Sequence, residues 1–411
     1  MTTGDLSTGG ARALAPVARE LQAALVDALG AAVGAEIRQS ALTRALALDK
    51  SLASRLARAV TADGVAEFLH YVPSPPGLNL MLEAIAPEDI SPAQRLRVER
   101  AIVAFRGMLE TLPGGRADLE AMLSDETPFL RERALRTAGQ STFRGVSAQL
   151  GYQCGTLAST LAVFPSATNP DALDALEMQH RVGVRRLRPT AAIGLMRIRV
   201  EDPAAVQQPA VITIDREPIR RAEDVILREF TDTSIASFDV VGEGDGSEIL
   251  LALTEEQAAL HAPLTVTSGH ILREGFYRYR PPEGDGWEAR NYLLNMPCRR
   301  VVRDIYLHES CRVSAPEFSI HLPGAIGTPE PRNDGLLGRV ASVDVGAPRQ
   351  DLGRGVRRMG IRGLPSYAAA VKSAFDRAGL DPGAFHGYRI DLAYPLPLVF
   401  MSWWVRLADR K

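Results

Sequence analysis

The segment spanning residues 42–56 has the pattern of two short helices joined by a tight turn. Its apolar positions are spaced so that each helix has one buried face: Leu42, Ala45, Leu46, Leu48, Ala53 and Leu56. Ala47 falls at the turn, and Asp49 precedes the second helix, where its carboxylate can accept hydrogen bonds from free backbone N–H groups. The outer side of the second helix carries small polar and basic residues: Lys50, Ser51, Ser54, Arg55 and Arg58. A helix with such a face is suited to the major groove of DNA.

This segment resembles the helix-turn-helix of bacterial transcription regulators, including those of winged-helix type. The family pattern reads roughly L-A-x-x-L-G-[VL]-S-x-x-x-V-S-R-x-L, and it is matched here at Leu42, Leu46, Leu48, Ser54 and Arg55. The chain departs from the pattern at Thr43 for the usual alanine, Ala47 for the turn glycine, Asp49 for the usual serine and Ala53 for the usual valine. The resemblance implies a DNA-binding unit in the N-terminal segment alone.

The turn of this motif often needs a positive φ, which glycine tolerates and alanine resists. Ala47 therefore implies either a modified turn or an alanine-rich helical hairpin that only packs. Local charge is the second test of DNA binding, because the net charge of −2 gives no overall attraction to nucleic acid or to an anionic membrane. Residues 36–60 contain five basic and two acidic side chains. This modest basic excess would serve a dimer better than a monomer.

Length and texture indicate more than one domain in the 411 residues. We predict a helix-turn-helix domain over residues 1–75, which begins with a helix over 15–33, and a helical connector and dimerisation segment over 76–185. The connector includes helices over 92–112 and 127–161, with Leu96, Ile102, Phe105 and Leu109 on one buried side. Residues 186–411 alternate in polarity and are rich in β-branched side chains, which predicts an α+β domain with a mostly antiparallel sheet and one helix over 365–378. The predicted fold class is thus multidomain, with an all-α N-terminal part that contains the helix-turn-helix and an α+β C-terminal domain.

The sequence offers little evidence of catalytic or metal chemistry. The four candidate zinc ligands, Cys298, His308, Cys311 and His321, are separated by nine, two and nine residues, whereas zinc modules show close paired spacings. We therefore predict no metal and no cofactor, and we find no catalytic motif. Three cysteines favour a reducing cytoplasm over a disulfide framework. The N-terminus lacks the pattern of a signal peptide, and the apolar run near residue 400 is too short to cross a membrane.

These observations predict a cytoplasmic, sequence-specific DNA-binding protein that regulates transcription. We expect a homodimer that binds two DNA half-sites one helical turn apart, without a membrane partner. The C-terminal domain would serve sensing or assembly and could hold a small-molecule effector, although the sequence does not point to its pocket. The alternative is a structural or self-assembling protein without DNA binding. An enzyme of unfamiliar fold ranks third.

Overall fold

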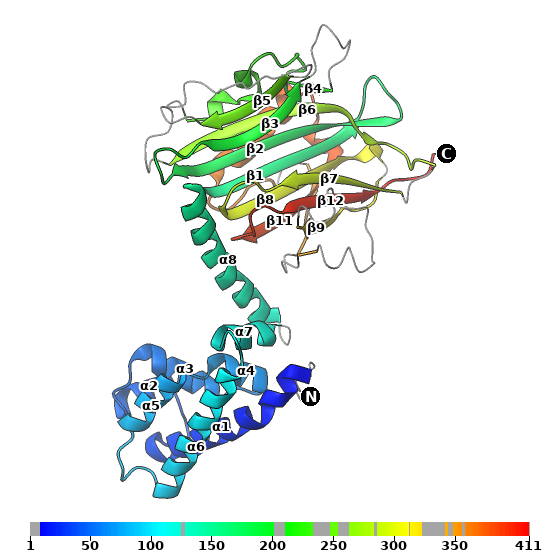
Figure 1. Ribbon diagram of the computed structural model, residues 1–411. Coiled ribbons are helices and arrows are strands. Elements are labelled where there is room, and N and C mark those ends of the chain that lie inside the picture. Colours follow the sequence, from blue (N-terminus) through cyan, green and yellow to red (C-terminus); the bar gives the residue numbers. More distant parts are fainter. Residues whose placement is uncertain are drawn as a thin grey trace. The chain divides into compact units, whose positions relative to one another are not determined.

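A computed structural model describes residues 9–124, 128–200, 210–232, 247–253, 263–282, 286–311, 313–322, 342–343, 348–355 and 358–410. The chain forms two compact units, Met1–Thr137 and Ala138–Lys411, with helices in the first and mostly strands in the second (Figure 1). The predicted order of an all-α part followed by a sheet-containing part is confirmed. The units divide near residue 137, whereas the sequence suggests boundaries at 75 and 185. Among the described helices, none has both the length and the apolarity that a membrane span requires.

The helical unit is built around one continuous hydrophobic core. Its helices are α1 (Gly9–Val33), α2 (Gln39–Ala45), α3 (Lys50–Val60), α4 (Val65–Tyr71), α5 (Pro75–Ala84), α6 (Pro92–Glu110) and α7 (Arg116–Ser124), and α8 (Pro128–Leu150) crosses the division between the units. The core includes side chains from Leu14 to Leu123, so it passes residue 75 without a break. Pro75 lies in the first turn of α5. Proline is tolerated there because backbone N–H groups in the first turn have no acceptor within the helix. The domain boundary expected at residue 75 therefore coincides with the start of a helix inside this core.

The predicted helices over 15–33 and 92–112 are confirmed as α1 and α6. In α6 the buried side chains include Ile102 and Phe105, as expected from their spacing. Leu96 is a correction, because 45% of it is exposed to solvent.

The turn between α2 and α3 contains an alanine in the left-handed region of backbone conformation. Ala47 lies in the left-handed region with φ +52°, where the family pattern has glycine. The carboxylate of Asp49 accepts hydrogen bonds from the backbone N–H groups of Ser51 and Leu52, at 2.8 and 3.0 Å. The predicted N-cap is thus confirmed, and Ala47 adopts the positive φ that alanine resists.

We expect Ala47→Gly to stabilise the helical unit by about 0.5–1 kcal/mol. A left-handed alanine costs about 1–2 kcal/mol, and the greater freedom of glycine in the unfolded chain offsets part of the gain. Ala47 is exposed, so its methyl group adds little packing. Urea unfolding followed by circular dichroism at 222 nm measures the change. Ala104→Gly, at an exposed position inside α6, is the matched control and should cost about 1 kcal/mol; a loss of stability in both variants would contradict the strain argument.

Within its described residues, the C-terminal unit contains a seven-stranded sheet, a three-stranded sheet and one long helix. The strands are β1 (Tyr152–Pro165), β2 (Ala172–Arg186), β3 (Ile193–Val200), β4 (Val211–Ile212), β5 (Ser247–Leu253), β6 (Leu264–Tyr277), β7 (Trp287–Leu293), β8 (Cys298–His308), β9 (Glu317–His321), β10 (Gln350–Arg354), β11 (Phe385–Ala393) and β12 (Phe400–Arg406). The long helix is α10 (Pro365–Arg377), and the short 3-10 helices of the described residues are η1 (Ala222–Val225), η2 (Arg228–Phe230), η3 (Glu309–Cys311) and η4 (Pro382–Ala384).

The seven-stranded sheet has the order β10-β11-β8-β1-β2-β6-β4, and its strands lie side by side in Figure 1. All neighbouring pairs are antiparallel except β1 and β8, which are parallel. The sheet is therefore mixed and mostly antiparallel. The three-stranded sheet has the order β7-β12-β9, and β3 pairs with β5 in a separate ribbon.

Both faces of the seven-stranded sheet are covered. On one face, Tyr367 and Phe375 of α10 form a core cluster with Ala158, Leu176 and Tyr306. On the other face, side chains of the three-stranded sheet, among them Met401 and Trp403, join the core of β1 and β8. The unit is thus layered as helix, large sheet and small sheet.

The helix predicted over 127–161 is wrong in its last third, from residue 151 onward. α8 ends at Leu150, Gly151 follows with φ +78°, and β1 begins at Tyr152. Because both faces of β1 are buried, its apolar side chains form a nearly continuous run without the alternation that marks a half-exposed strand. Such a run cannot be distinguished from a buried helix by periodicity alone.

Candidate functional site

Two surfaces of the described residues carry candidate functional side chains, one in each unit. The first is the outer side of α3. This helix buries Ala53, Leu56 and Ala59 at intervals of three residues, which directs the opposite side to solvent. The five residues predicted to contact DNA all lie away from these buried positions, with Ser54 half-buried and the others exposed: Lys50, Ser51, Ser54, Arg55 and Arg58.

Arg55 has a structural role that the sequence did not reveal. Its Nε donates to the carbonyl oxygen of Tyr71 at 3.2 Å, and its Nη2 donates to that of Val72 at 3.0 Å. These carbonyls belong to the end of α4, where the helix leaves its last acceptors without partners. The guanidinium of Arg58 lies 5.4 Å from the ring centroid of Tyr71. In contrast, the side chains of Lys50, Ser51 and Ser54 form no hydrogen bond or ion pair with any described residue.

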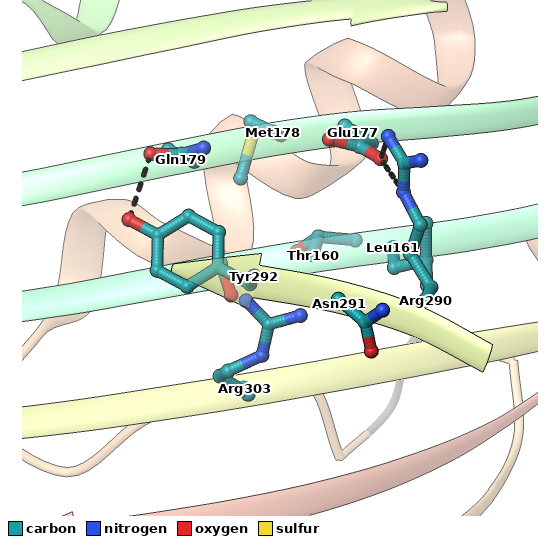
Figure 2. A pocket seen from close by; sticks show the side chains of 10 residues that line it. Thr160, Leu161, Glu177, Met178, Gln179, Arg290, Asn291, Tyr292 and Arg303 are labelled. Carbon is teal, nitrogen blue, oxygen red and sulfur yellow. Dashed lines mark hydrogen bonds and ion pairs between the residues drawn. The ribbon is translucent and has the colours of Figure 1, made fainter. Parts of the chain in front are cut away.

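The second surface is a cleft between the seven-stranded sheet and strand β7, which we call the inter-sheet cleft (Figure 2). It is lined by Ser159, Thr160, Leu161, Glu177, Met178, Gln179, Arg290, Asn291, Tyr292 and Arg303. Strand register brings its polar side chains together. Arg303 of β8 pairs with Ser159 of β1, Ser159 pairs with Gln179 of β2, and Gln179 pairs with Ser268 of β6. One polar row thus crosses four strands, and Glu177, Arg181 and His270 flank it on the same face.

Strand β7 faces the large sheet and contributes Arg290 and Tyr292 to the inter-sheet cleft, two positions apart along the strand. Arg290 forms an ion pair with Glu177, and its Nε donates to the glutamate Oε1 at 2.5 Å. The hydroxyl of Tyr292 donates to Oε1 of Gln179 at 3.2 Å, as Figure 2 shows. His270 approaches the second oxygen of Glu177 at 3.8 Å. The carboxylate of Glu177 is therefore already engaged by Arg290.

Two further arginines, Arg181 of β2 and Arg303 of β8, lie at or beside the inter-sheet cleft. Neither forms an ion pair with a carboxylate among the described residues. Arg181 is fully buried, and its guanidinium donates to Ser268, to Gln179 and to the carbonyl oxygen of Leu195, which are all neutral acceptors. Arg303 is 4% exposed and donates to none of the described residues. Its guanidinium lies 4.6 Å from the ring centroid of Tyr292, and its buried Nε has no hydrogen-bond partner.

Burial shifts the ionisation of several groups around the inter-sheet cleft. It lowers the pKa of Arg303 to about 10, because the charged form loses its hydration. It raises the pKa of the Glu288 carboxyl, two residues before Arg290 on β7, to about 7. Burial also acts to raise the pKa of Glu177, but Arg290 and His270 outweigh it and hold that pKa below its usual range. The site therefore combines buried positive charge with few compensating carboxylates.

A contact between the buried His180 and the exposed Ser366 lies on the other face of the large sheet. The hydroxyl of Thr267 donates to the carbonyl oxygen of Phe230 at 2.6 Å, so it accepts from Nδ1 of His180 at 2.7 Å. Nε2 of His180 then accepts from the hydroxyl of Ser366 at 2.9 Å. This order resembles a nucleophile and its base, but burial lowers the pKa of His180 to about 4. Its ring is too weak a base for efficient proton abstraction near neutral pH.

The four candidate zinc ligands do not come together. Cys298 begins β8 and His308 ends it, about 30 Å apart along an extended strand. Cys311 follows in η3, and His321 lies in the three-stranded sheet. Within the described part of the chain, no group of three histidine, cysteine or acidic side chains could hold a metal ion.

Comparison of the chain with protein-family models and with curated proteins gave no match.

Proposed function

We propose that the helical unit binds DNA and that α3 enters the major groove, as part of a transcription regulator. The observation that carries this proposal is the conformation of Ala47. An alanine that adopts a positive φ where the related motif has glycine supports a selected turn geometry over an accidental helical hairpin. The Asp49 cap then starts α3 with its first turn exposed. In helix-turn-helix proteins the first residues of the recognition helix contact base edges.

The contacts within the unit divide the predicted DNA-binding residues into two groups. The side chains of Lys50, Ser51 and Ser54 form no hydrogen bond or ion pair within the described part of the chain, and we assign direct DNA contacts to them. Arg58 packs over Tyr71, so its charge is held in place beside the groove and is suited to a phosphate. Arg55 is needed at the end of α4 and is a poor probe, because its removal would also loosen the fold.

We propose that the regulator acts as a homodimer, because one helix-turn-helix alone contacts too few base pairs for high specificity. The outer side of α6 supports this proposal. Leu96 and Val103 are 45% and 64% exposed and stand seven residues apart, which places them on one stripe of the helix. A second copy of α6 would cover them.

The test is selection of bound sites from random-sequence DNA with the full chain, followed by affinity measurements at two salt concentrations. We expect the wild-type protein to select a site with two half-sites one helical turn apart. Lys50→Glu should weaken binding at least tenfold at low salt and reduce the slope of log affinity against log salt by about 1. The cause is the loss of one cationic contact and the repulsion of the new carboxylate by DNA.

Lys372→Glu provides a control with the same change in net charge. Lys372 is exposed on α10 in the C-terminal unit and pairs with Asp376. Its substitution should leave DNA affinity nearly unchanged. Equal weakening by both substitutions would show that α3 is not the contact, and a wild-type protein without DNA affinity at low salt would refute the proposed function.

A further inference from the structure

We propose that the inter-sheet cleft binds the carboxylate group of a small organic acid, and that the guanidinium of Arg303 is its principal partner. This site lies in the C-terminal unit, and the inference is independent of the proposed DNA binding. Three features of the cleft support it: uncompensated buried charge, free hydrogen-bond donors and limited volume.

The charge balance of the inter-sheet cleft favours an anion. Glu177 forms its ion pair with Arg290 and acts on Arg303 only as a more distant charge, and neither Arg181 nor Arg303 forms an ion pair with a described carboxylate. A buried, unpaired charge is costly to a fold, and buried charges in proteins are normally paired. Arg181 at least donates three hydrogen bonds to neutral groups. Arg303 donates none within the described residues, so it is the group that an anion would satisfy.

Donors and geometry indicate where the anion would sit. The ring of Tyr292 packs against the guanidinium of Arg303 and restrains its plane. A planar guanidinium matches the two oxygens of a carboxylate and can hold both at once. Ser159 is the register partner of Arg303 on the neighbouring strand and lines the same cleft. Its hydroxyl bonds to no described residue and can supply a further donor.

The volume of the inter-sheet cleft selects among anions. The space open to a water-sized molecule is about 20 Å³, and with its opening to solvent the cleft measures about 300 Å³. One water needs roughly 10–15 Å³ by this measure, so the inner space accepts little more than one such position. A planar carboxylate fits this space better than a tetrahedral phosphate with four oxygens. The rest of the acid would extend past Arg290 and Asn291, which lie at the more exposed side.

Acetate is the probe, because it presents a carboxylate with a minimal tail. Thermal unfolding of the full chain is followed by tryptophan fluorescence in sodium acetate, and sodium chloride and sodium phosphate of equal ionic strength are the reference salts. Saturation-transfer NMR of the acetate methyl group reports binding directly. We expect acetate to raise the unfolding midpoint of the wild-type protein in a saturable way, more than either reference salt.

Arg303→Met should remove this response or require at least tenfold more acetate, because a hydrogen-bonded ion pair is lost. In acetate-free buffer the same substitution should leave the midpoint unchanged or raise it, since an unpaired buried charge is replaced by an apolar chain. If Arg303 only stabilised the fold, Arg303→Met would instead lower the unfolding midpoint in acetate-free buffer. Arg300→Met is the matched control on the same strand. Arg300 pairs with Asp391, so this substitution should lower the midpoint and preserve the acetate response.

Arg303→Lys keeps the charge without the planar fork and should bind acetate several-fold more weakly, which keeps the test decisive if the methionine variant does not fold. An undiminished acetate response in the Arg303 variants would overturn the proposal. So would a wild-type response to chloride or phosphate that equals the response to acetate, or the absence of any acetate response.

Discussion

Replacement of Asp304 by alanine is expected to destabilise the C-terminal unit by about 3–5 kcal/mol, because it leaves a buried arginine without its counter-charge. The side chain of Asp304 is fully buried beneath α10. Its two oxygens accept hydrogen bonds from Nε and Nη2 of Arg389, each at 2.7 Å. The hydroxyls of Tyr306 and Tyr367 donate to the same carboxylate at 3.1 and 2.9 Å. One substitution therefore removes the acceptor for four hydrogen bonds.

Urea unfolding followed by tryptophan fluorescence measures this effect selectively. All three tryptophans, Trp287, Trp403 and Trp404, lie in the C-terminal unit. Asp215→Ala is the control, because Asp215 pairs with Arg377 at a partly exposed site and should contribute less than about 1 kcal/mol.

The double substitution Asp304→Leu with Arg389→Met tests the cause of this loss. It should recover much of the stability, since it removes the unpaired charge as well as the pair. If Asp304→Ala lowered the unfolding free energy no more than Asp215→Ala does, water would have to reach the Asp304–Arg389 ion pair.

Local features of the fold could be predicted from the sequence where neighbouring residues determine them. The α2 and α3 helices followed from apolar spacing, and the Asp49 cap followed from its place before the first turn. The role of Arg55 could not be predicted in this way. Its acceptors, Tyr71 and Val72, are 16 and 17 residues away and become neighbours only when α4 packs beside α3.

The inter-sheet cleft depends on contacts that are still more distant in sequence. Arg303 and Ser159 become neighbours through the parallel pairing of β1 and β8, and a single sequence does not reveal such a pairing. In β2, the polar residues Glu177, Gln179 and Arg181 occupy every second position, a pattern typical of a strand with one face in water. The structure instead covers this face with the three-stranded sheet, so the same alternation produces a buried polar site. The polar residues at every second position of β2 are thus a sequence signal for this site, but such a pattern usually indicates a face exposed to solvent.

The stability of the C-terminal unit should fall as the pH is lowered from about 6.5 to 4, and His180 should account for about 3 kcal/mol of this loss. Its pKa is lowered to about 4 because it is buried, whereas an unfolded histidine titrates near 6.5. The folded state therefore holds the ring neutral while the unfolded state takes up a proton. This contribution is complete above pH 6.5 and is lost as the pH falls toward the folded pKa. A proton on Nε2 would also disturb the bond that Ser366 donates.

Two variants with opposite expected slopes test this assignment. The difference in unfolding free energy between wild type and His180→Gln should be constant above pH 7 and should shrink by about 3 kcal/mol between pH 6.5 and 4. For Glu288→Gln, the difference in unfolding free energy from wild type should change with pH in the opposite direction. Burial raises the pKa of Glu288 to about 7, so its protonated form stabilises the fold at low pH and this contribution is lost as the pH rises from about 4.5 to 7. Parallel pH profiles for wild type and His180→Gln would show that water enters beside the ring and that His180 is not held neutral by burial.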